Sequence, residues 1–156
     1  MTPIKIRITR LSESTHDVPL PLYATAGSAG MDIYSAVKDD LVIQPGETVL
    51  VPTGFSMELP LGFEAQIRPR SGLAIKNNIG LMNSPGTIDS DYRGEVKIVV
   101  TNHGKNDFIV RRGDRVAQMV IGRYERAEWV VVQELSSTER GAGGFGSTGT
   151  SHTHRK

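Results

Sequence analysis

The chain has 156 residues, a length that suits a single domain of ordinary size. Its net charge of +1 is nearly balanced, which is not typical of proteins that coat nucleic acid. It contains no cysteine, so disulfides, thiolate nucleophiles and cysteine-based zinc sites are excluded.

Glycine and proline recur between short β-branched runs, a pattern typical of many short strands in an all-β barrel or sandwich. Only residues 71–77, SGLAIKN, are expected to form a helix, and it is short. Strands are expected, in chain order, at residues 4–8, 47–52, 54–59, 63–68, 95–100, 115–121 and 129–135.

No run of about 18 apolar residues predicts a transmembrane helix. The amino terminus, MTPIKIRITR, also lacks the apolar core of a secretory signal. We therefore expect a cytoplasmic protein whose partners include neither a membrane nor a nucleic acid.

The composition changes after Leu135, where glycine, serine and threonine dominate. Such a segment buries too little apolar surface to order itself, so the sequence predicts a β body over residues 1–135 and a flexible tail over residues 136–156. The tail is either an inert linker or a segment that folds over a ligand. Phe145 favours the second reading, because a lone aromatic ring among glycines can stack on a ligand.

Residues 141–149 of the tail, GAGGFGSTG, resemble a phosphate-binding loop, since glycine lets successive N–H groups point at one anion. The segment lacks the lysine of the Walker motif, and it also lacks the strand before and the long helix after that a P-loop NTPase requires. A P-loop NTPase is therefore not expected. Arg140, Ser147 and Thr148 can still bind a terminal phosphate.

The body carries two further candidate sites for phosphate and metal. In PRSGLA (69–74), Arg70 offers a planar fork of donors to phosphate oxygens, and the alternative is a helix N-cap at Ser71 beside solvated arginines. Asp32 lies between apolar residues on an expected strand. Its carboxylate either faces solvent or holds the water shell of a Mg²⁺ ion.

A third polar segment lies between strand candidates at residues 79–83 and 95–100, and this spacing predicts a β-hairpin. Its turn is either an ordinary Asp/Gly-rich turn or a frame of fixed backbone groups around a flat ligand. The segment contains Asn83, Gly86, Asp89, Asp91, Tyr92 and Gly94.

Five segments, in this order, resemble the five motifs of the trimeric deoxyuridine triphosphatase (dUTPase) family. They are SAGMDIYSA (28–36), RPRSGLA (68–74), NSPGTIDSDYRGE (83–95), GDRVAQMVI (113–121) and RGAGGFGSTG (140–149). The resemblance runs from about Pro19 to Gly149, and the final TSHTHRK lies beyond its last motif.

The resemblance implies a homotrimer of jelly-roll-like β-barrels with active sites at the subunit contacts. It also implies hydrolysis of dUTP to dUMP and pyrophosphate with Mg²⁺, through attack of water on the α-phosphorus. Such a reaction keeps uracil out of DNA and supplies dUMP for thymidylate synthesis.

Carried over by position, the resemblance makes Asp89 the general base that orients and deprotonates the attacking water. Asp32 meets the water shell of the Mg²⁺ ion, which the triphosphate itself chelates. The implied phosphate ligands are Arg70, Ser71, Gly72, Gln118, Arg140, Gly146, Ser147 and Thr148.

The resemblance places uracil against the backbone of the predicted turn, whose fixed N–H and C=O groups reject cytosine. The amide of Asn83 can turn over and serve either base. Tyr92 packs on the deoxyribose and leaves no room for a 2′-hydroxyl, and Phe145 stacks over the uracil. The other residues expected to line the substrate pocket are Thr87, Ile88 and Lys97.

Asp114 and Arg115 are expected to form ion pairs that orient loops rather than to contact substrate. Two rival functions stay open. One is a dCTP deaminase of the same fold, and the other is a nucleotide-sensing module without catalysis.

Overall fold

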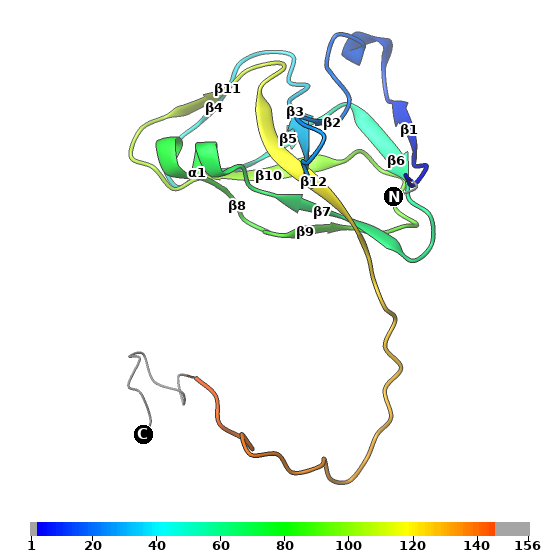
Figure 1. Cartoon of the computed structure of the whole chain (residues 1–156). Helices are drawn as coiled ribbons and strands as arrows, with labels where there is room; N and C mark the ends of the chain where they lie inside the picture. The colour runs from blue at the N-terminus through cyan, green and yellow to red at the C-terminus, as the bar shows by residue number, and fades with distance from the viewer. Residues whose placement is uncertain (1–2, 146–156) are drawn as a thin grey trace. The chain divides into compact units, whose positions relative to one another are not determined.

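The computed structural model describes residues 3–145, and the chain divides into two units, residues 1–125 and 126–156 (Figure 1). The first unit is the β body. Its elements are β1 (Arg7–Arg10), the 3-10 turn η1 (Glu13–Thr15), β2 (Leu22–Tyr23), β3 (Met31–Tyr34), β4 (Leu41–Ile43), β5 (Thr48–Pro52), β6 (Phe55–Glu58), β7 (Phe63–Arg68), α1 (Ser71–Asn77), β8 (Ile79–Leu81), β9 (Gly86–Ile88), β10 (Lys97–Asn102), β11 (Phe108–Val110) and β12 (Arg115–Arg123).

The strands form four antiparallel sheets, in the orders β2-β3-β12-β7-β9, β5-β10-β8, β1-β6 and β11-β4. The β1-β6 and β11-β4 pairs lie at opposite ends of the body (Figure 1). The prediction of an all-β fold is confirmed. The expected jelly-roll-like barrel, however, is not closed by hydrogen bonds within the body, because its ladders are interrupted between the four sheets.

One apolar core joins the four sheets through side chains. Successive residues of a strand point to opposite faces, so alternating sequences bury one side. On β7, Ala65 and Ile67 are buried, and on β10 Ile98 and Val100 are buried while Lys97 is exposed. The alternation visible in the sequence therefore decides which side chains reach the core.

The helix lies where the sequence predicts it, at Ser71–Asn77, and the strand predicted over residues 63–68 is also confirmed. The strands predicted over residues 4–8, 47–52, 54–59, 95–100 and 115–121 overlap β1, β5, β6, β10 and β12. The sequence did not reveal β2, β4, β9 and β11, because strands of two or three residues are too short to show a period of two.

The predicted hairpin over residues 79–100 does not have a tight turn, because a further strand lies between its two arms. β8 and β10 do pair, with Leu81 opposite Val100. Between them the chain leaves this sheet, and β9 pairs with β7, with Thr87 opposite Gln66. The loop of residues 89–96 therefore connects two different sheets.

The strand predicted over residues 129–135 is wrong, since no residue from 126 to 145 lies in a strand. A strand is stable only when a neighbouring backbone pairs with its N–H and C=O groups, and the described residues offer this segment no such neighbour. Trp129 and Val131 are 89% and 96% exposed. None of the described helices is long and apolar enough to cross a membrane.

Arg112 connects the segment of residues 14–17 to the rest of the body. Its guanidinium donates hydrogen bonds to the carbonyl oxygens of Ser14, Ala36 and Val37. It also donates to both carboxylate oxygens of Asp17, from Nε at 2.7 Å and from Nη2 at 2.6 Å. These hydrogen bonds from Arg112 lower the pKa of Asp17 from its ordinary value of 3.8 to about 2.

This pair predicts a pH-dependent contribution to stability. A folded-state pKa below the unfolded-state pKa stabilises the fold fully above about pH 3.8, and the contribution is lost as the pH falls through about 2. Asp17→Asn should therefore lower the Tm at pH 6, and the difference from wild type should be much smaller at pH 2 and vanish below it. In an Arg112→Gln background the same substitution should leave the Tm unchanged at both pH values. A constant difference at every pH would contradict the prediction.

Candidate functional site

The first pocket of interest, here the loop pocket, has a volume of about 400 Å³ and lies where the 89–96 loop meets β5, β9 and β10. Five residues that the sequence assigned to substrate binding meet there, all from the continuous stretch of residues 87–97. The pocket is lined by Leu50, Thr87, Ile88, Asp89, Tyr92, Glu95 and Lys97.

Tyr92 is held in the loop pocket by its side chain and by its backbone. Its hydroxyl donates to the carbonyl oxygen of Glu95 at 3.0 Å, and its backbone N–H donates to the carbonyl oxygen of Asp89 at 3.2 Å. A Cβ on Gly94 would collide with the phenol ring of Tyr92, so glycine is required at this position. Asp89 and Tyr92 are thus held together by one turn of backbone.

Two residues of the loop pocket were not found by sequence reasoning. Glu95 Oε1 accepts from the backbone N–H of Gly54 at 3.0 Å, and Glu95 Oε2 lies 3.5 Å from Lys97 Nζ. Leu50 is 59% exposed on β5. An apolar residue on the outward face of an alternating strand is the only signal in the sequence that could have pointed to Leu50.

The second pocket, here the arginine pocket, has a volume of about 420 Å³ and lies at the meeting of β3, β12 and the start of α1. Five further predicted site residues meet in it, namely Asp32, Arg70, Ser71, Gly72 and Gln118. The other lining residues are Ala24, Ser28, Ala29, Gly30 and Arg115.

Asp32 is paired with two arginines in this pocket. Its Oδ1 accepts from Arg70 Nε at 2.9 Å, and its Oδ2 accepts from Arg115 Nη1 at 3.1 Å. Arg70 also donates to the carbonyl oxygen of Arg115 at 3.2 Å. The side chain of Asp32 is only 15% exposed, so the reading of a solvent-facing carboxylate does not hold. Two positive charges against one negative charge leave the pocket suited to an anion.

The register of β12 places Gln118 in the arginine pocket, opposite Asp32 of β3 and opposite Arg68 of β7. Its amide Nε2 donates to the carbonyl oxygen of Pro69 at 2.9 Å and so holds the chain that leads into α1. The alternative of an N-cap at Ser71 is wrong, because Arg70 occupies the N-cap position and makes no side-chain capping bond.

Within the described residues, no group of three or more His, Asp or Glu side chains is placed to bind a metal ion. Mg²⁺ commonly keeps several waters and binds through one or two carboxylates together with substrate phosphates. Asp32 fits that pattern as a single carboxylate beside an anion pocket. Asp32 is the single carboxylate that lines the arginine pocket and could face the water shell of such an ion.

Of the other predicted site residues in the body, Asn83 lines neither pocket. The amide of Asn83 lies against Gly86. In the second unit, Arg140 Nε donates to the carbonyl oxygen of Gly143 at 2.8 Å, and the ring of Phe145 is fully exposed. Gly146, Ser147 and Thr148 lie outside the described residues.

The fold and its pockets define a small all-β protein with an anion pocket and a second, separate pocket beside the 89–96 loop. A family model described as dUTPase matches residues 16–149. A deoxyuridine 5'-triphosphate nucleotidohydrolase from Anaplasma marginale (strain St. Maries) is 56% identical over 147 residues, which cover 94% of this chain and 99% of that protein. The chain belongs to the dUTPase family.

Solved structures agree with this assignment. A mutant dUTPase of Staphylococcus bacteriophage 80alpha, with dUpNHpp, matches with a TM-score of 0.84 at 25% identity, over 94% of this chain and 99% of that one. A mutant dUTPase from phage phi11 of S. aureus, described with a structural Mg(II) ion, matches with a TM-score of 0.76 at 23% identity, over 86% and 100% of the two chains. The second likeness supports the fold alone.

The packing of Gly30 predicts a mild but specific defect in anion binding. A Cβ at Gly30 would lie 2.6 Å from Gln118 Oε1, so Gly30→Ala should push that side chain away from Pro69. One disturbed hydrogen bond costs about 1 kcal/mol, or about a fivefold loss of affinity. Titration calorimetry with inorganic triphosphate should show this loss. Gly27→Ala, which meets open space, is the matched control and should bind as wild type does.

Proposed function

We propose that this member of the dUTPase family hydrolyses dUTP to dUMP and pyrophosphate, with Asp89 directing a water molecule at the α-phosphorus. The reaction keeps uracil out of DNA and supplies dUMP for thymidylate synthesis. The observation that carries this proposal is the pairing of a carboxylate-bearing loop pocket with an arginine pocket in a chain 56% identical to a curated dUTP nucleotidohydrolase.

The loop pocket suits the deoxyuridine part of the substrate. Uracil presents one N–H donor between two carbonyl acceptors, and fixed backbone groups can match that pattern while rejecting cytosine. The ring of Tyr92 offers an apolar face for the deoxyribose. Gly94 and Glu95 fix the position of that ring, so the ring cannot move aside for a 2′-hydroxyl on the sugar, which would clash with it.

Asp89 acts as the base in this proposal. Its side chain lines the loop pocket, and its backbone carbonyl is held by Tyr92. Phosphoryl transfer depends mainly on positioning and charge stabilisation, so a carboxylate of ordinary basicity is sufficient when it orients the water in line with the leaving group.

The arginine pocket suits the phosphates. An arginine carries five N–H donors, and Arg70 uses only some of them on Asp32 and on the carbonyl oxygen of Arg115. The free donors, the hydroxyl of Ser71 and the open backbone at Gly72 are available to phosphate oxygens. Bound Mg²⁺ would neutralise part of the triphosphate charge, with Asp32 facing its water shell.

The active site is assembled between copies of the chain in a homotrimer. The loop pocket and the arginine pocket share no lining residue, which supports a site completed by a second copy. The tail completes the site through Arg140, Phe145, Gly146, Ser147 and Thr148. The expected compartment is the cytoplasm, and neither a membrane nor a nucleic acid takes part.

Asp89→Asn tests the proposed base. The amide keeps the size and polarity of the side chain but does not accept a proton from water, so kcat should fall about 100-fold or more while the Kd for dUpNHpp changes little. Pyrophosphate release from dUTP, dCTP, dTTP and UTP by wild type is the reference. Unchanged turnover of the variant would remove Asp89 from the role of base, and release of ammonia from dCTP by wild type would favour the deaminase instead.

Subunit mixing tests the shared site. Asp89→Asn chains and chains lacking residues 140–156 should each be nearly inactive alone. Trimers refolded from both should regain measurable activity, because some sites combine an intact Asp89 with an intact tail from a neighbour. Mixtures that stay as inactive as their components would show that each chain uses its own tail.

A further inference from the structure

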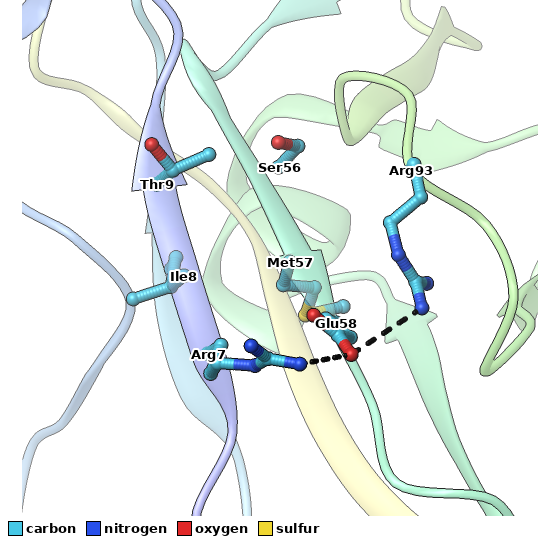
Figure 2. Close-up of a pocket in the computed structure, with 7 residues that line it drawn as sticks. All are labelled: Arg7, Ile8, Thr9, Ser56, Met57, Glu58 and Arg93. Atoms are coloured by element: carbon cyan, nitrogen blue, oxygen red, sulfur yellow. Dashed lines mark hydrogen bonds and ion pairs between the residues drawn. The ribbon is translucent and has the colours of Figure 1, made fainter.

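Arg93 belongs to the same loop as Asp89 and Tyr92, yet it does not line the loop pocket. Its side chain lines a separate hollow of about 180 Å³ formed with β1 and β6 (Figure 2). None of the residues that line this hollow lines the loop pocket. Arg93 therefore affects a bound ligand only through the loop itself.

The guanidinium of Arg93 ties the loop back onto itself. Nη1 donates to the carbonyl oxygen of Ser90 at 2.8 Å and to that of Tyr92 at 3.0 Å. These two carbonyls lie in the short stretch between the proposed base and the proposed sugar contact. A charged donor forms stronger hydrogen bonds than a neutral one, so this contact restricts the stretch from Asp89 to Tyr92.

The same guanidinium is anchored outside the loop. Arg93 Nη2 lies 3.7 Å from Glu58 Oε1 at the end of β6, and that oxygen also accepts from Arg7 of β1 at 2.5 Å. Figure 2 shows Glu58 between the two arginines, which reach it from opposite sides. The β1-β6 pair thus gives Arg93 a fixed point on a sheet that contains neither β9 nor β10.

We propose that Arg93 is a positioning residue, which sets the distance and orientation between Asp89 and Tyr92 and uses Glu58 as its anchor. The side chain of Arg93 is about half exposed, so its ion pair contributes little to global stability. Its effect is local, because the two carbonyl contacts fix the part of the loop that carries both functional side chains. The inference rests on the proposed function for its kinetic consequences.

The test compares Arg93→Ala, Arg93→Lys, Glu58→Gln and the matched control Arg7→Ala. Arg7 shares Glu58 with Arg93 but makes no hydrogen bond or ion pair with residues 89–96 in the described part of the chain. Arg93→Ala should lower kcat for dUTP about tenfold, since small misplacements of a catalytic group are costly. It should also reduce the preference for dUTP over UTP about fivefold, because Tyr92 loses its fixed place.

Arg93→Lys should recover part of the preference, since it keeps a positive charge near Glu58 and loses only the planar fork. Glu58→Gln should weaken the preference less than Arg93→Ala does. Arg7→Ala should keep wild-type kinetics. All four variants should melt within a few degrees of wild type, because Arg7 and Arg93 are exposed and Glu58 is only partly buried.

A second measurement does not depend on activity. The amide hydrogen of Tyr92, bonded to the carbonyl of Asp89, should exchange with deuterium faster in Arg93→Ala than in wild type and at the wild-type rate in Arg7→Ala. Unchanged exchange and unchanged dUTP:UTP preference in Arg93→Ala would overturn the positioning role. So would equal losses on both nucleotides matched by a lower Tm. A wild-type protein that does not hydrolyse dUTP would instead refute the proposed function and leave the exchange result to decide the inference.

Discussion

The register of β12 is the constraint on which the anion-binding part of the molecule depends. β12 is the central strand of the largest sheet and pairs with β3 on one side and β7 on the other. Gln118 therefore lies beside Asp32 and beside Arg68, and its amide reaches the chain that starts α1. A slip of one residue would turn Gln118 to the opposite face and break the pocket, but the buried Ala117 and Met119 prevent it, because the same slip would expose them.

Charge is arranged in the arginine pocket before any ligand arrives. Removing Asp32 from water carries a desolvation cost, and the two arginines offset it by pairing with both of its oxygens. The result is a group of paired charges with a net positive sign. A phosphate that enters such a site meets donors already in place, so little reorganisation is needed when charge develops on its oxygens.

The loop pocket is rigid for a different reason. Residues 89–96 leave one sheet and join another, so both ends of the loop are fixed by ladders. Further contacts fasten the middle, including Glu95 on the backbone of Gly54, and Thr53 on the carbonyl oxygen of Val96. The glycine at residue 94 is explained by the ring that lies against it. The hydrogen bonds that stabilise this loop are therefore also the ones that hold the ligand-facing residues of the loop pocket in place.

The sequence by itself determined the all-β class, the helix at 71–77, most strands of the body and the dUTPase family. These follow from the local alternation of apolar and polar residues, from the glycines and prolines between strands, and from the order of the motifs. It also grouped most candidate site residues by motif. Only the tertiary structure decided that Asp32 is shared by two arginines, that Leu50 and Glu95 join Tyr92, and that residues 129–135 form no strand. Each of these depends on backbone or charge partners far away in the chain, and a local pattern carries no information about which distant segment will pack beside it.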